Sequence, residues 1–496
     1  MRAEVLAPPS IGGGEMMRCQ GLISAVKDLF KLLIALLLYG GFAPLLGVMM
    51  ASRRAWQRAL FGLMIFMPTL QPGRFTLMIG SIEKYRGHTK GYEVSLIEVF
   101  AIALIIAVAQ SPRDPAVPPR KGWPPGTWLY ALWTVVGLLS VANAWDASMA
   151  WMAFSRFGKG TLIFVAAAMY LRDDKDLRAA LIGLGLSLVV QGWICMKMRY
   201  LEGYFQIKGW FEHQNPMSMW AYMTACVVFA AALHKDIKGR LLWLCLAAFG
   251  AAGLCVLLSV SRAALAAYAV GAAIVLGMAW LRGPGVRTAV FSVMGLVGAV
   301  LVMMFAMDSL NSRLKEVKES KEKNAEDLRP VLNRQCLAML HDYPLLGIGW
   351  NNYGLANSRP LGAKYSAILE EWDAERGFAI IDELYWGNPL TESLYYLLLA
   401  ENGWLGWSLF LLFEAVTLRC AIRAWLYHGK SLMGYVAFGI LVALSICYLH
   451  GTVERILTQT KNLSHWLMLA GMVSGMEMSR RAAVRFSKLV APSVRR

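Results

Sequence analysis

The sequence predicts an all-α protein that crosses a membrane repeatedly, with about 12–13 transmembrane helices and one large outer loop that contains short helices. Three observations predict this class. Of 496 residues, 57% are hydrophobic and only 16% are charged, whereas soluble proteins carry about 25% charged residues. Apolar runs long enough to cross a bilayer recur along the chain, and one long polar segment, 308–389, interrupts them. This composition excludes an ordinary soluble domain and a disordered chain.

A spanning helix needs about 20 apolar residues. The candidate spans are 32–50, 56–72, 94–109, 128–145, 157–171, 179–198, 216–233, 241–259, 263–281, 288–307, 390–417, 432–449 and 463–478.

Two of these apolar runs have features that affect how they cross the membrane. As one helix, the run 241–281 would be about 60 Å long, twice the thickness of the hydrocarbon core. We therefore expect it to break at Arg262, its one charged residue. The pair Gly40-Gly41 leaves open whether 29–50 crosses the membrane or only dips into it.

Charge divides the chain and orients it. The loop 308–389 holds 13 acidic and 10 basic residues in a chain of net charge +17, and the tail after 478 is rich in arginine. Because basic segments stay in the cytoplasm, we expect the tail inside and the loop outside, which fits the three candidate spans between them. The predicted parts are an N-terminal segment (1–28), an N-terminal transmembrane bundle (29–307), the large loop (308–389), C-terminal transmembrane helices (390–478) and a basic cytoplasmic tail (479–496).

A net positive charge can indicate nucleic acid as a partner, but no basic, aromatic-rich soluble domain is present, so we interpret the basic residues as markers of cytoplasmic loops and expect no nucleic acid. Eight cysteines are present, and none forms a C-x-x-C pair. We interpret them as small buried hydrophobic residues and expect no metal site, no disulfide framework and no cofactor.

Arg262 is the first candidate for chemistry on the outer side. A guanidinium is permanently charged and binds phosphate through two parallel hydrogen bonds, so an arginine at the mouth of a helix pair could hold a diphosphate. An arginine that only anchors a helix end is the alternative interpretation.

The second candidate is a helix in the loop that begins near Pro330 and ends before Pro344. Arg334 and His341 are seven residues apart and lie within about 20° of each other on that helix. The turn after the helix contains the polar run Asn351-Asn352-Tyr353. A surface helix followed by an aromatic turn on the bilayer is the alternative.

The third candidate is Glu392, at the start of the next span, with Tyr395 and Tyr396 one helical turn away. A partly buried carboxylate at a membrane surface can act as a general base. Alternatively, Glu392 neutralises a nearby arginine. Glu401 lies about 180° away around the helix and is expected to pair elsewhere.

Four patches together resemble the O-antigen ligase and O-antigen polymerase superfamily of bacterial multi-pass enzymes. They are Gly209 to Asn215 (which includes His213), Ser261 to Leu265, Arg334 to Tyr353, and Glu392 to Gly406. The last patch is similar to a family pattern of His, then Asn, Ser or Gln, nine residues, Gly, two residues and Gly. Glu392 stands where the family's ligases usually have His, which slightly favours an O-antigen or exopolysaccharide polymerase over a lipopolysaccharide ligase.

The resemblance implies metal-independent glycosyl transfer at the periplasmic side of the bacterial inner membrane. The implied donor is a glycan on undecaprenyl diphosphate, and the implied acceptor is lipid A–core or another lipid-linked glycan. Arg262 and Arg334 match the family's arginine positions, and Glu392 takes the place of the base. His213, Asn215, His341, Asn351, Asn352, Tyr353, Tyr395 and Tyr396 are the predicted substrate-binding residues.

Two other functions stay open. A transporter or flippase of lipid-linked sugars could use the same arginines, but it would favour charges deep within the spans and paired, broken helices. A non-catalytic assembly protein that has lost the histidine is the other alternative, and proton transfer by Glu392 would distinguish it from an enzyme.

Overall fold

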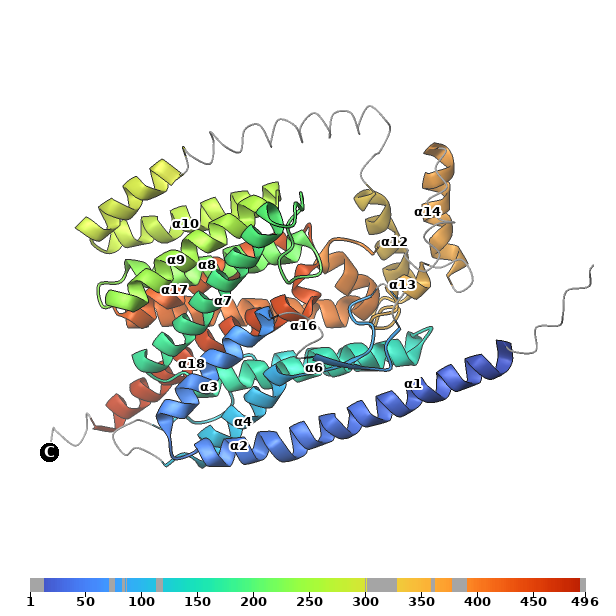
Figure 1. The fold of residues 1–496 in the computed structure, drawn as a ribbon, viewed down its shortest axis with the longest axis horizontal. Coiled ribbons are helices and arrows are strands. Elements are labelled where there is room, and N and C mark those ends of the chain that lie inside the picture. The colour runs from blue at the N-terminus through green and yellow to red at the C-terminus, as the bar shows by residue number, and fades with distance from the viewer. Residues whose placement is uncertain are drawn as a thin grey trace, which may run out of the picture.

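The computed structural model describes residues 13–70, 76–82, 85, 87–112, 119–298, 300, 328–357, 362–376 and 390–490. Most of these residues are helical, and the long helices run side by side in one bundle (Figure 1). The predicted all-α multi-pass membrane class is confirmed. Parts of the predicted span 288–307 (299 and 301–307), of the predicted loop (308–327, 358–361 and 377–389), of the N-terminal segment (1–12), of the proline-rich connection (113–118) and of the tail (491–496) lie outside the described residues.

The α-helices are α1 (Gly13–Leu36), α2 (Ala43–Met50), α3 (Arg54–Phe66), α4 (Leu96–Gln110), α5 (Thr127–Leu139), α6 (Ala147–Tyr170), α7 (Asp174–Tyr200), α8 (Gln214–Leu233), α9 (Gly239–Leu258), α10 (Arg262–Arg282), α12 (Arg329–Asp342), α13 (Tyr353–Ala356), α14 (Ala363–Arg376), α16 (Leu394–His428), α17 (Leu432–His450) and α18 (Thr460–Val490). The short elements are the π-helix η1 (Leu37–Phe42), the 3₁₀ turns η2 (Met67–Thr69), η3 (Ser140–Asn143) and η4 (Ile456–Thr458), and the strands β1 (Thr76–Ile79) and β2 (Tyr92–Ser95).

Seven helices of the described chain are long and apolar enough to cross a membrane, and three shorter apolar helices accompany them. Large apolar side chains on several of them are exposed, such as Leu37 (70%), Trp193 (69%) and Trp243 (71%). Exposed apolar surface of this extent is unfavourable in water but suits contact with lipid. The chain is an integral membrane protein.

Two local predictions are confirmed, and the structure also describes the N-terminal run that the sequence left open. The run 241–281 breaks where expected, with α9 ending at Leu258 and α10 beginning at Arg262. Helix α12 has Pro330 in its first turn and ends two residues before Pro344. The N-terminal helix continues through η1 without a break, and Ala25–Met50 is long enough to span.

An antiparallel hairpin precedes α4, which the sequence did not predict. Strand β1 pairs with β2 in a register that sets Thr76 opposite Ser95. Ser95 then caps α4 through a capping box with Glu98, so the hairpin leads directly into the helix. The hairpin lies at the end of the bundle where α3 finishes and α4 begins.

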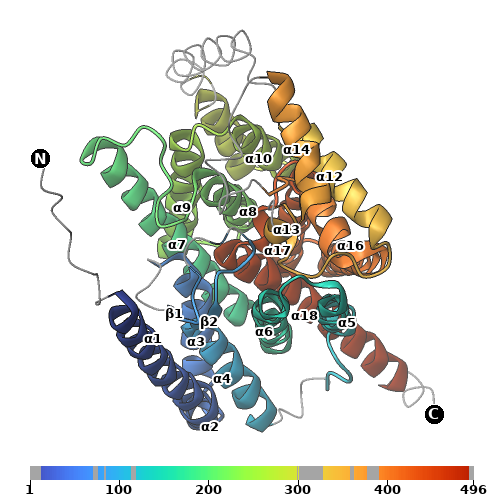
Figure 2. The same cartoon turned by 90° about the vertical axis from the view of Figure 1, so that its right-hand side faces the viewer.

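Helix α8 forms the centre of the bundle, and Figure 2 shows it between α9, α10 and α17. Helix α18 packs against α6 through Gly471 and Gly475, which are four residues apart on one face of α18. A Cβ atom at either glycine would lie within 2.5 Å of a backbone oxygen of α6. Small residues let two membrane helices approach this closely, and this packing fixes the position of the α18 N-terminus beside the candidate site.

Helix α16 is kinked at Gly403, whose φ of +62° favours glycine. The kink exposes backbone groups that bind the turn after α12. Trp404 donates its amide to the Pro344 carbonyl at 2.8 Å, and Ile348 donates to the Ala400 carbonyl at 2.9 Å. A Cβ atom at position 403 would lie 2.4 Å from the Leu345 oxygen. The first glycine of the family pattern therefore joins the loop to the membrane helix.

Candidate functional site

Four polar side chains from separate parts of the chain meet in one cluster, which we call the carboxylate site: Asn215, Arg329, Glu392 and Glu454. Arg329 forms an ion pair with Glu392, and its guanidinium nitrogen lies 3.9 Å from a carboxylate oxygen of Glu454. Asn215 donates a hydrogen bond of 2.9 Å to the same oxygen. One arginine thus lies between two carboxylates.

Helix ends assemble this site. Asn215 is in the first turn of α8, which His213 caps, and Arg329 begins α12. Glu392 precedes α16, and Glu454 follows α17. The Leu394 amide donates to the Gly451 carbonyl at 2.9 Å, which ties the last two elements together.

The two carboxylates differ in their surroundings. Glu392 has a side chain that is 45% exposed, whereas that of Glu454 is 17% exposed. Burial and, to a smaller extent, the negative charge of Glu392 together raise the pKa of Glu454 to about 7, against the opposing effect of Arg329. A carboxyl group that titrates near neutral pH is suited to proton transfer.

Arg262 and Arg334, the two predicted diphosphate-binding arginines, are both exposed. Neither side chain forms a hydrogen bond or ion pair with another described residue. Helices α8, α9 and α10 alternate in direction, and the Tyr268 hydroxyl donates to the Phe249 carbonyl at 2.9 Å across the α9–α10 hairpin. The start of α10 therefore lies at the same end of the bundle as the start of α8.

The two predicted histidines, His213 and His341, differ in position and in exposure. His213 accepts the Asn215 amide at 3.4 Å. Burial lowers its pKa, although the charge of Glu392 acts in the opposite direction. His341 is 88% exposed at the far end of α12 and contacts Asp342 at 3.4 Å. Only His213 is near the carboxylate site.

Asn351 and Asn352 are fully buried, and their side chains bind the protein itself. Asn351 accepts the His88 amide at 2.6 Å and donates to the Thr89 carbonyl at 3.1 Å. Asn352 accepts the Asp146 amide at 2.9 Å. These bonds hold the turn after α12 against segments ahead of α4 and α6.

Tyr353 belongs to the same buried region. Its amide donates to Glu401 at 3.1 Å, and its hydroxyl donates to Gln335 at 3.1 Å. Glu401 also lies 2.6 Å from His88 Nε2. Glu401 therefore pairs away from Glu392, as expected from its place on the helix.

The two predicted tyrosines of α16 point in different directions. The Tyr395 hydroxyl donates to Glu414 at 3.1 Å and lies 3.0 Å from the Tyr448 carbonyl, within the helical bundle. Tyr396 packs against a small cluster of buried residues that includes Met339 of α12 and Ile348 of the turn that follows α12. Unlike the Tyr395 hydroxyl, the Tyr396 hydroxyl forms no hydrogen bond with another described residue.

Sequence reasoning missed Arg329, Glu454 and the neighbouring Arg455, as well as the buried His88. The doublet Glu454-Arg455 between two candidate spans was a usable signal, because charges at the ends of spans on the loop side could meet the loop. Arg329 had no signal that distinguished it from Arg334 on the same helix.

In the described chain, no group of three or more His, Cys, Asp or Glu residues is arranged to hold a metal ion. The seven cysteines whose environment is described are all buried and unbridged. The carboxylate site itself offers two carboxylates, one guanidinium and one amide, and the His213 imidazole lies next to Asn215.

Comparison with known protein families identifies part of the chain. The family model described as O-antigen ligase matches residues 245–411, from within α9 to within α16. This match confirms the resemblance to the O-antigen ligase and polymerase superfamily, and its range includes Arg262, Arg334 and Glu392. No curated protein matches the chain.

Proposed function

We propose that this O-antigen ligase-like membrane protein transfers a glycan from undecaprenyl diphosphate to a sugar hydroxyl, at the periplasmic side of the bacterial inner membrane. The family match supports membrane glycosyl transfer of the ligase or polymerase type. The donor, the acceptor, the side of the membrane and the roles of single residues are our proposal.

The observation that carries the proposal is the position of Arg329 between Glu392 and Glu454. Glu392 neutralises and positions Arg329, which corresponds to the alternative role considered for it from sequence. Glu454 is the less exposed carboxylate, and its pKa of about 7 leaves it partly ionised at neutral pH. We assign Glu454 as the general base and Glu392 as its partner across Arg329.

The reaction forms one bond to the anomeric carbon, breaks another, and moves one proton. The acceptor hydroxyl oxygen attacks the anomeric carbon of the donor, and the bond from that carbon to the diphosphate oxygen breaks with its electron pair. The hydroxyl proton passes to the carboxylate of Glu454. Arg262 and Arg334 hold the diphosphate, because guanidinium groups bind phosphate oxygens in pairs and stabilise the charge on the leaving group.

The other predicted residues have supporting roles in this proposal. Asn215 and His213 contact the acceptor next to Glu454. Tyr396 and His341 lie along the glycan, since their polar atoms are not used in the helical bundle. Asn351, Asn352, Tyr353 and Tyr395 shape the site through the buried bonds described above.

Reconstitution tests the proposal. The purified protein in nanodiscs is supplied with a glycan on undecaprenyl diphosphate, and with either lipid A–core or a second lipid-linked glycan as acceptor. We expect a new glycosidic product and released undecaprenyl diphosphate, both unchanged by EDTA. In vesicles, movement of the intact donor across the membrane without formation of a glycosidic bond would instead indicate a transporter.

A further inference from the structure

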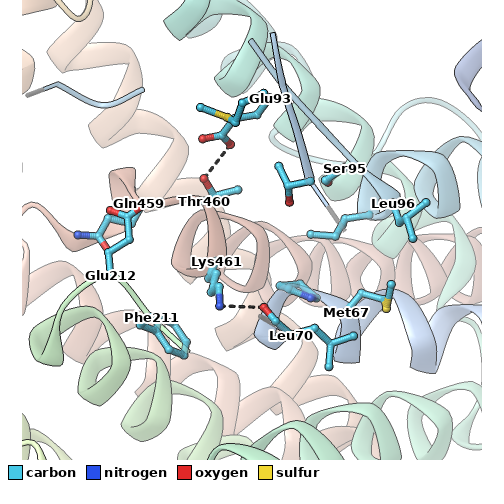
Figure 3. Close-up of a pocket in the computed structure, with 14 residues that line it drawn as sticks. Met67, Leu70, Glu93, Ser95, Leu96, Phe211, Glu212, Gln459, Thr460 and Lys461 are labelled. Carbon is cyan, nitrogen blue, oxygen red and sulfur yellow. Dashed lines mark hydrogen bonds between the residues drawn. The ribbon is translucent and has the colours of Figure 1, made fainter. Parts of the chain in front are cut away.

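A pocket of about 230 Å³ lies at the same end of the bundle as the carboxylate site but outside the segment that matches the family (Figure 3). Its walls come from η2, the β1–β2 hairpin, the start of α4, the segment before α8 and the start of α18. Met67, Leu70, Leu96 and Phe211 make much of its wall apolar.

The fixed polar groups of the pocket are held by internal bonds. Lys461 donates to the Leu70 carbonyl at 3.0 Å and also to the Trp210 carbonyl, and its ammonium lies 4.8 Å from the centre of the Phe211 ring. Thr460 donates to Glu93 at 2.8 Å, and Arg156 lies 3.7 Å from the same carboxylate. These bonds make a rigid lining.

Two further polar side chains are available to a ligand. The side chains of Gln459 and Glu212 lie next to each other at one side of the pocket in Figure 3. Neither forms a side-chain hydrogen bond or ion pair with a described residue. Gln459 can both donate and accept hydrogen bonds, and Glu212 can accept.

The charges decide which ligand fits. The lining contains one cation, Lys461, and two carboxylates, Glu93 and Glu212. Glu93 is already paired with Arg156, so an anion would meet the carboxylate of Glu212, and two of the three ammonium hydrogens of Lys461 already bind carbonyl groups. A cation would have to compete with Arg156 for Glu93. An uncharged ligand with several hydroxyl groups and an apolar face suits carboxylate and amide acceptors beside an aromatic ring.

Distance along the chain links the pocket to the carboxylate site. Glu212 and Asn215 are three positions apart in sequence, so their Cα atoms are at most about 11 Å apart. Glu454 and Gln459 are five residues apart, at most about 18 Å. A short glycan could place one sugar in the pocket and another beside Glu454.

We propose that the pocket lined by Gln459, Glu212 and Phe211 binds an uncharged sugar ring of the acceptor glycan, one or two units from the hydroxyl that reacts. The assignment of this sugar to the acceptor rests on the proposed glycosyl transfer. The binding of a sugar in the pocket does not depend on it. The volume is below the ~300–1,000 Å³ of sites for drug-sized ligands, which suits a single ring.

Photocrosslinking of the full-length protein in nanodiscs tests sugar binding directly. The probe is an alkyl maltoside that carries a diazirine on the sugar, and the comparison probes are the matching alkyl phosphate and alkyl phosphocholine. We expect the maltoside to label pocket peptides and unlabelled maltoside to compete. Gln459→Ala and Glu212→Ala should each weaken competition by about 3- to 10-fold, as expected for one lost hydrogen bond.

The matched control is Glu202→Ala, because Glu202 is on the same outer segment as Glu212 but pairs with Lys197 at 2.9 Å. This control should label like the unmodified protein. Equal labelling by the alkyl phosphate, or unchanged competition in both pocket variants, would overturn the sugar site. Labelling that behaves as expected in a protein without glycosyl transfer would instead reject the proposed function and leave the sugar site intact.

The acceptor role has its own measurement. In the transfer assay, Gln459→Ala should raise the KM for the acceptor and leave the KM for the donor unchanged. A rise in donor KM alone would move the pocket to the donor and overturn the acceptor assignment.

Discussion

Asn215 donates a hydrogen bond of 2.9 Å to Glu454, although 239 positions separate them in sequence. This bond joins the first turn of α8 to the connection after α17. It satisfies one lone pair of a carboxylate that is otherwise poorly hydrated, and it leaves the second oxygen of Glu454 for another partner. A carboxylate held in this way is positioned to receive a proton from a bound hydroxyl.

The pH dependence of transfer should report the charges around Glu454. Because the base must be ionised, activity should fall as the pH drops below the pKa of Glu454, about 7. Glu392→Gln removes a negative charge that raises this pKa, so the acid limb should move to lower pH. Arg329→Gln removes a positive charge that lowers it, so the limb should move to higher pH. Profiles of kcat/KM between pH 5 and 9 measure both shifts.

The opposite signs are the informative feature of this experiment. Asp342→Asn is a suitable control, since Lys364 and Tyr365 lower the pKa of Asp342 to about 2 and it stays ionised over the range measured. Its profile should match that of the unmodified protein. Shifts in the same direction for Glu392→Gln and Arg329→Gln would mean that a different group sets the acid limb.

Donor binding should depend on the guanidinium groups of Arg262 and Arg334. Replacement of either by Ala should abolish or strongly reduce transfer at normal protein levels, and Lys should restore little, because an ammonium lacks the planar fork. Arg199→Ala serves as control, since Arg199, at the end of α7, already donates to the Tyr204 carbonyl at 3.2 Å. Full activity of the Lys variants would mean that both arginines only anchor their helices and do not bind the diphosphate.

The topology can be tested by cysteine labelling in intact spheroplasts, in a background with Cys19 replaced by serine. The seven other cysteines are buried, so they should react slowly. Leu345→Cys, at a position 70% exposed, should react with an impermeant maleimide, whereas Arg485→Cys in the tail should react only after lysis. The reverse pattern would put the carboxylate site in the cytoplasm.

The parts of the site that the sequence could predict follow from strong local rules. Pro330 and Pro344 bounded α12, and the length of an apolar run required a break at Arg262. The identity of the partner of Glu392 could not be predicted in this way. Arg329 and Arg334 are on one helix, and only the packing of α12 on α16 decides which arginine meets the carboxylate.

Tertiary structure also decided the roles of polar residues in the turn after α12. A run of two asparagines and a tyrosine reads as a ligand site when it is taken as an exposed loop. The kink at Gly403 instead draws this turn onto α16, and His88, from a segment 263 positions away from Asn351, completes its hydrogen bonds. No periodicity or spacing marks a pairing of that range.

Asn351 allows this structural role to be tested. Its φ of +59° is tolerated by asparagine, and its buried amide bonds to two other segments. Asn351→Ala should therefore lower the unfolding free energy by about 1–3 kcal/mol per polar group left unpaired, and it should lower the thermal midpoint in detergent. His341→Ala, at an exposed position, should leave the midpoint unchanged. A stable Asn351→Ala protein with a raised substrate KM would restore the substrate-binding role predicted from sequence.

Turnover of Glu454→Gln at saturating donor and acceptor tests the central claim most directly. Glutamine keeps the hydrogen bond from Asn215 within reach but cannot accept the proton, so kcat should fall by about 10²–10⁴-fold. Glu392→Gln should retain far more turnover, and its main effects should be on donor KM and on the acid limb. Unchanged turnover in Glu454→Gln, or a 10²-fold or greater loss confined to Glu392→Gln, would contradict the assignment of Glu454 as the base.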